Sequence, residues 1–172
     1  MVTEADGFRL LGPPVRKVIR ADETTIGEVL REANYTTAHF GKWHLGGGGL
    51  AAHGYAASDG DTGNRDAEPF TDPNPVDICG LGERALVFMK TAQRQKKPFF
   101  IQMSYHALHY PENARASTIA TFAEAGRSGN KANNANKDRR GITWDLDDGV
   151  GRLEQQHQLS SRCSGPNANG DL

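Results

Sequence analysis

The sequence predicts an α/β fold in which helices alternate with parallel strands of a central sheet. Three segments carry apolar residues at helical spacing, and two short runs rich in β-branched and aromatic residues lie between them. Because each strand is followed by a loop and a helix, the order favours parallel strand pairing. The 172 residues suffice for one domain or part of one.

The first helix is predicted over residues 25–33, because Ile26, Val29 and Leu30 share one face. Thr24 or Thr25 can cap its start, and Asn34 can end it in a left-handed conformation. The first strand follows at residues 35–40. Residues 41–78 show little periodicity, so we expect a long loop there.

The second half predicts a helix over 80–95, a buried strand over 99–105, a loop over 106–138 and a last helix over 139–157. The buried face of the last helix is predicted at Ile142, Leu146, Val150 and Leu153, with Asp145, Asp147 and Asp148 on its solvated side. The predicted organisation is an irregular segment over 1–23, an α/β domain over 24–153 and an irregular tail over 154–172.

The composition excludes several classes of function. The 20 basic and 21 acidic residues give a net charge of −1, which argues against nucleic-acid binding. No apolar run approaches the ~20 residues of a membrane span. The first 20 residues lack the apolar block of a secretory signal. Two cysteines without a C-x-x-C pair predict neither a disulfide framework nor a zinc site. Compartment and oligomeric state stay open.

Polar clusters follow both predicted strands. Lys42 and His44 come after the first strand, and His106 and His109 come after the second. If the strands are parallel neighbours, these side chains converge where their carboxyl ends meet, the usual place for ligands in such sheets. A fixed cation and several imidazoles suit an oxyanion such as sulfate or phosphate. Alternatively, the adjacent aromatic residues pack and the histidines only cap loops.

Two segments of the sequence resemble the sulfatase family, the arylsulfatase-like branch of the alkaline-phosphatase superfamily. Residues 24–46, TTIGEVLREANYTTAHFGKWHLG, are similar to its signature around Gly-Lys-Trp-His, with Asn34 in place of a glycine. Residues 98–111, PFFIQMSYHALHYP, resemble its strand that ends in His-x-Pro-His-x-Pro, with Leu108 in place of a proline. The shorter segments 53–55 and 145–153 are also similar. The resemblance implies part of an alkaline-phosphatase-like three-layer sandwich with a mostly parallel central sheet.

The resemblance implies a hydrolase of sulfuric esters that acts on a sulfated small molecule or glycan. Lys42 and His44 match the family residues that contact formylglycine and sulfate, and His44 would take up a proton. His109 matches the histidine that binds sulfate and protonates the leaving oxygen. The substrate-binding residues would therefore be Lys42 and His109, with His106 in a supporting role. The family cofactors implied are calcium and a formylglycine residue.

The sequence also departs from the family pattern. We find no Cys-x-Pro-x-Arg segment before Lys42, no paired aspartates near the start and no Asp-Asn-Gly segment. Residues 59–64 are interpreted as a polar surface turn, because Gly63 stands where a calcium loop needs a ligand. We therefore expect a truncated chain without the nucleophile and metal ligands, and doubtful turnover. Two alternatives stay open: a non-catalytic relative that binds an oxyanion or sulfated glycan, and a phosphoesterase of the same superfamily.

Overall fold

The computed structural model describes residues 16–109, 113–124 and 135–162. Three parallel strands form the sheet within these residues, in the order β2-β1-β3. They are β1 (Thr36–Gly41), β2 (Ala57–Ser58) and β3 (Phe99–Ser104). The two predicted strands are therefore parallel neighbours, in a register that runs from Thr36 beside Phe99 to Gly41 beside Ser104. This part of the prediction is confirmed.

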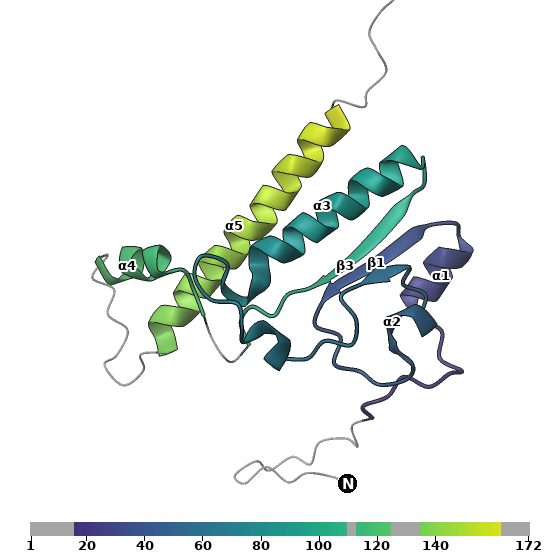
Figure 1. The fold of residues 1–172 in the computed structure, drawn as a ribbon, viewed down its shortest axis with the longest axis horizontal. Helices are drawn as coiled ribbons and strands as arrows, with labels where there is room; N and C mark the ends of the chain where they lie inside the picture. The colour runs from purple at the N-terminus through teal and green to yellow at the C-terminus, as the bar shows by residue number, and fades with distance from the viewer. Residues whose placement is uncertain (1–15, 110–112, 125–134, 163–172) are drawn as a thin grey trace, which may run out of the picture.

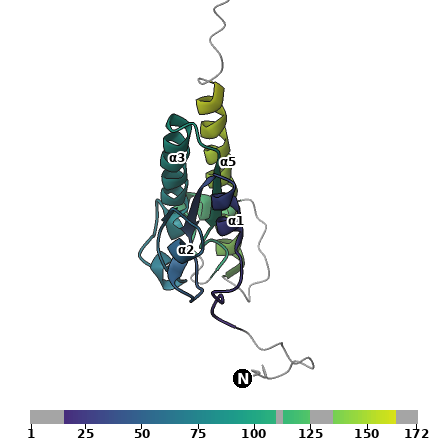
Figure 2. The same ribbon diagram turned by 90° about the vertical axis from the view of Figure 1, so that its right-hand side faces the viewer.

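The helices differ widely in length, and their arrangement gives three layers. They are α1 (Ile26–Glu32), α2 (Gly49–Ala52), α3 (Ile78–Arg94), α4 (Ala116–Glu124) and α5 (Ala135–Arg162), with the single 3-10 turns η1 (Arg65–Ala67) and η2 (Pro75–Asp77). Figures 1 and 2 show α3 and α5 side by side, with α1 and α2 grouped away from them. No helix among the described residues is both long and apolar enough to cross a bilayer.

The first helix is fixed by its own sequence. Thr25 and Glu28 form a reciprocal capping box, in which each side chain accepts a hydrogen bond from the other's backbone N–H. Asn34 follows the helix with a φ of 66°, the left-handed conformation expected there. Both predicted ends of α1 are confirmed.

The core forms between β1 and α3, because strand side chains alternate between the faces of the sheet. Ala38 and Phe40 pack against Leu81 and Ala85 of α3. On the other face, the Thr37 hydroxyl donates to the carbonyl of Gly54. The central strand β1 is buried after its first residue, whereas β3 is half-buried along its length rather than fully buried as expected. In the described sheet β3 is an edge strand, and this explains the difference.

Two predicted loops contain regular structure. The segment 41–78 holds α2, β2 and both 3-10 turns, and the segment 106–138 holds α4. Short or β-branched stretches such as those of α4 have weak helical propensity and depend on tertiary packing, here against α5. Helix α5 is also longer than predicted at both ends: it begins at Ala135 instead of 139, and residues 158–162 of the expected irregular tail are helical beyond the predicted end at 157. Those residues contain no glycine or proline, and the rest of the tail lies outside the described residues.

Asp145 contradicts the prediction that it lies on the solvated side of the last helix. The residue is 3% exposed, and its carboxylate accepts hydrogen bonds from Arg115 Nε at 2.8 Å and Thr118 Oγ1 at 2.7 Å. Asp145 follows the fully buried Ile142 by three positions, which places both on one helix face. Asp147 is exposed as predicted. Asp145 therefore joins α4 to α5 through a buried polar network.

We expect Asp145→Ala to lower the free energy of unfolding by about 3 kcal/mol, because it leaves the half-buried Arg115 without its main partner. The matched control Asp147→Ala removes an exposed carboxylate two positions away and should change stability by no more than about 0.5 kcal/mol. Urea denaturation of both variants measures the difference. Equal losses in the two variants would contradict the assignment of Asp145 to the interior.

Candidate functional site

The two predicted polar clusters meet at the carboxyl edge of the sheet. The backbone N–H of Lys42 donates to the carbonyl of Ser104 at 2.8 Å, so the β1–β3 ladder continues one residue beyond β1. His106 lies two residues after this point and is buried. Burial is the main cause that lowers the pKa of His106, and the charge of Lys42 lowers it further. Lys42 and His106 are therefore close enough to interact electrostatically.

A single connecting segment, residues 59–64, joins both clusters. The carbonyl of Thr62 accepts hydrogen bonds from the backbone N–H groups of Trp43 and His44, each at 3.0 Å. The hydroxyl of Thr62 donates to the carbonyl of Gly41, the last residue of β1. Further along, the side-chain amide of Asn64 lies 3.0 Å from Nε2 of His109. Lys42, His44 and His109 thus belong to one edge of the sheet and one hydrogen-bonded frame.

The exposure of these side chains differs in a way that suits a ligand site. His44 and His109 are exposed, and Lys42 is half-buried. His44 adopts a φ of 57°, a left-handed conformation that is uncommon for residues other than glycine. Trp43, which lies between Lys42 and His44 in the chain, packs its ring against His39, His53 and Tyr55. The aromatic residue therefore anchors the segment, while its two polar neighbours stay accessible.

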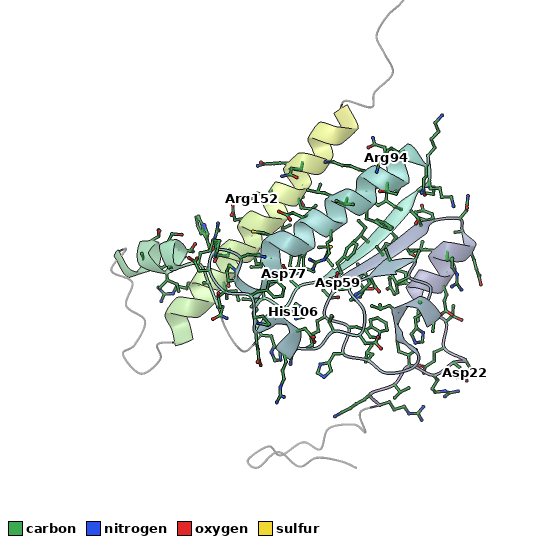
Figure 3. The ribbon with its side chains drawn as sticks, in the orientation of Figure 1. Asp22, Asp59, Asp77, Arg94, His106 and Arg152 are labelled. Carbon is green, nitrogen blue, oxygen red and sulfur yellow. The ribbon has the colours of Figure 1, made fainter. Side chains whose placement is uncertain are left out.

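Beneath this edge, Arg84 of α3 is held between two carboxylates. It donates through Nη2 to Asp59 at 3.0 Å and to Asp77 at 2.7 Å. Burial alone would lower the pKa of Arg84, but the hydrogen bonds to Asp77 and Asp59 outweigh it, so the pKa is raised. Asp59 also accepts from the backbone N–H of Gly41 at 2.8 Å. Figure 3 shows Asp59, Asp77 and His106 together where the strands end and α3 begins.

Sequence reasoning missed the residues that build this frame. It treated the segment 59–64 as a surface turn, yet Asp59 and Thr62 bond to the end of β1, and Asn64 bonds to His109 after β3. Arg84 was not singled out either. Its partners are 7 and 25 residues away in the chain, so no local spacing signals the pairing. The predicted site residues Lys42, His44 and His109 are placed by the structure, and their roles stay predictions. Tyr110 and Pro111 lie outside the described residues.

Comparison with known proteins shows where this chain belongs. A sequence model described as Sulfatase matches residues 4–164, which is most of the chain. The chain belongs to the sulfatase family. The match also extends beyond the segments 24–46, 53–55, 98–111 and 145–153, which carry the resemblance in the sequence.

Named relatives of this sulfatase are arylsulfatases. Arylsulfatase A of Homo sapiens is 30% identical over 159 residues, an alignment that covers 70% of this chain and 30% of that protein. Arylsulfatase G of Rattus norvegicus is 27% identical over 137 residues, which covers 52% of this chain and 26% of that protein. The chain therefore spans less than a third of the length of the curated relatives it matches.

Solved structures support the fold. The crystal structure of Ps i-CgsB has a TM-score of 0.64 and 22% sequence identity, and the match covers 82% of this chain and 38% of that chain. A second structure of that protein, in complex with k-i-k-neocarrahexaose, matches equally well. The predicted alkaline-phosphatase-like α/β architecture is thereby confirmed for this sulfatase.

Sulfatases generally use calcium and a formylglycine residue. Calcium takes about six to eight oxygen ligands. The described part of this sulfatase contains no group of three or more His, Cys, Asp or Glu side chains that could hold a metal ion. The carboxylates nearest the strand ends, Asp59 and Asp77, are already paired with Arg84. The described residues therefore do not fit calcium, because a guanidinium fills the place between these carboxylates.

We expect this sulfatase to lose stability as the pH falls from 6.5 to 5.5. Burial lowers the pKa of both His39 and His106 in the folded chain, whereas an unfolded chain takes up these protons near pH 6.5. In that range the unfolded state binds more protons, so the free energy of unfolding falls with acidification. Denaturation curves at several pH values measure the slope.

Replacing His106 by glutamine should flatten this dependence in part, because His39 continues to titrate. The matched control His44→Gln changes an exposed side chain instead of a buried one. A parent stability that does not change between these pH values would refute the linkage to buried neutral histidines.

Proposed function

We propose that this chain forms the sulfate-binding part of a sulfuric ester hydrolase. The observation that supports it most strongly is the common frame around segment 59–64, which ties Lys42, His44 and His109 to one edge of the sheet. The carboxyl edge of a parallel sheet is where ligands bind in such folds. Membership of the sulfatase family and arylsulfatase relatives make a sulfate ester the natural ligand.

The roles that we propose are those that the resemblance to the sulfatase family implies, and they fit the charge changes of sulfate-ester cleavage. Negative charge builds up on the leaving oxygen and on the sulfuryl oxygens, and fixed donors stabilise both. Lys42 supplies a permanent cation with three donors for the sulfuryl oxygens. His109 binds sulfate and donates a proton to the leaving oxygen, and His44 takes up a proton. His106 is buried and burial lowers its pKa, so its ring stays neutral. We assign it a supporting role.

The substrate we propose is a sulfated small molecule or glycan. An open edge with two exposed histidines suits a sulfate group carried on a larger molecule. The neighbour crystallised with k-i-k-neocarrahexaose shows that a protein of this fold accepts an oligosaccharide. Recognition of the organic part rests with residues other than Lys42, His44 and His109.

A second candidate is binding of the oxyanion without turnover. Cys79 is the cysteine within the described residues, and it lines a groove between α3 and α5 together with Gly149 and Arg152. Those helices do not carry Lys42 or His109, and the groove that Cys79 lines contains none of the proposed sulfate-binding residues. This observation on the described residues favours a role in binding the oxyanion.

Sulfate should raise the melting temperature of the chain, and Lys42→Ala should remove most of that increase. At ten times its dissociation constant, sulfate stabilises by about 1.4 kcal/mol through mass action. Sulfate also stabilises proteins non-specifically, so chloride at matched ionic strength is the reference. Lys90→Ala is the matched control, because Lys90 is an exposed lysine of α3. Identical sulfate responses in the two variants would rule out the proposed site.

An activity assay on the same purified chain distinguishes hydrolysis of a sulfate ester from binding without turnover. With 4-nitrophenyl sulfate as the probe, release of 4-nitrophenol that disappears in His109→Ala supports the hydrolase. Stabilisation by sulfate without product release supports the binding role, which we expect for these 172 residues alone. Faster cleavage of 4-nitrophenyl phosphate than of the sulfate ester would point instead to a phosphoesterase.

A further inference from the structure

His109 receives a defined hydrogen-bond partner from a distant part of the chain. Asn64 lies 45 residues earlier, and its Nδ2 is 3.0 Å from His109 Nε2. The other amide atom of Asn64, Oδ1, is buried and has no hydrogen-bond partner among the described residues. Burial deprives Oδ1 of its hydrogen bonds to water, which costs folding free energy unless the atom gains a partner in another state of the site.

The backbone of Asn64 is held on both sides, so this contact is not a chance meeting of two free side chains. On one side, Thr62 is bonded to the end of β1. On the other side, Ala67 is 2% exposed, packs in the core with Ile78 and Ile142, and donates its N–H to the carbonyl of Asn64. The backbone N–H of His109 donates to the carbonyl of His106, in a turn that follows β3. The backbone of Asn64 is therefore fixed on both sides where its side chain meets His109.

The chemistry of the pair fixes the tautomer of the ring. An amide nitrogen can only donate, so Nε2 of His109 must accept. A neutral imidazole that accepts at Nε2 carries its proton on Nδ1. The contact with Asn64 thus selects the Nδ1–H tautomer and leaves Nδ1–H as the hydrogen-bond donor of the neutral ring.

The same side chain can also serve the protonated ring. In the imidazolium both nitrogens donate, so Nδ2 of Asn64 no longer fits. Rotation of the amide by half a turn about its Cβ–Cγ bond presents Oδ1 to Nε2–H. This rotation breaks no hydrogen bond of Oδ1, because that atom has none among the described residues. An amide can therefore partner the neutral Nδ1–H ring and the imidazolium in turn, whereas a carboxylate can only accept from Nε2–H and an aliphatic side chain can do neither.

We propose that Asn64 is a positioning residue for His109, which sets its neutral tautomer and partners both of its protonation states. The importance of His109 as a proton donor rests on the proposed sulfate-ester function, but the Asn64–His109 pairing does not. Asn64 acts through His109 and has no assigned contact with substrate.

Long-range proton–nitrogen NMR of the histidine rings tests this pairing in the full 172-residue chain. At a pH where the rings are neutral, we expect His109 in the Nδ1–H form. Asn64→Leu removes the amide donor to Nε2, so it should shift the ring towards the Nε2–H form. Asn64→Asp should also give the Nε2–H form, because both carboxylate oxygens accept. The exposed ring of His44 is the internal control and should keep its tautomer in both variants.

An Nε2–H ring in the parent chain, or the same tautomer in the parent and Asn64→Leu chains, would overturn the proposal. The readout needs neither turnover nor sulfate, so it is independent of the proposed function. If the tautomer follows Asn64 while sulfate gives no Lys42-dependent stabilisation, the positioning role stands and the sulfate site fails. If sulfate gives a Lys42-dependent stabilisation while the tautomer does not follow Asn64, the positioning role of Asn64 fails and the sulfate site stands.

Discussion

The parallel pairing of β1 with β3 is the constraint on which the rest of this structure depends. Its register sets Gly41 beside Ser104, and the bond from Lys42 N–H to the Ser104 carbonyl carries it one step further. A shift of one residue would turn Ala38 and Phe40 away from α3 and expose them. The core therefore fixes the register, and the register places the two strand-end clusters at one edge.

The edge itself is built by partners that come from far along the chain. The segment 59–64 closes over the end of β1, and Arg84 joins this segment to the start of α3 through Asp59 and Asp77. Buried ion pairs add little net stability, because desolvation offsets most of their attraction. Their value here is geometric, since they hold the loop that touches both His44 and His109.

Local patterns in the sequence predicted the elements that surround the site. Periodicity, capping residues and β-branched runs placed α1, β1, α3 and β3 to within one or two residues. The order of these elements predicted parallel pairing, which in turn predicted that Lys42, His44 and His109 share an edge. Helix α4 was not predicted, because its stability comes from packing against α5 rather than from its own residues.

The partners of the site could not be predicted in the same way. Asp145 meets Arg115 across 30 residues, and Asn64 meets His109 across 45. Such pairs depend on how loops cross in space, and a single sequence carries no spacing that reports it. The segment 59–64 shows this clearly: its polar composition indicated a surface turn, and the same polar groups bind the end of β1 and His109 in the turn after β3.

The most direct test of this account is a crystal structure of the chain grown with selenate, a heavier analogue of sulfate that anomalous scattering can locate. The account predicts a selenate ion within about 3 Å of both Lys42 Nζ and a ring nitrogen of His109. Selenate found only at other basic residues, such as the exposed Lys96 and Lys97, would contradict the claim that the β1–β3 edge forms an oxyanion site.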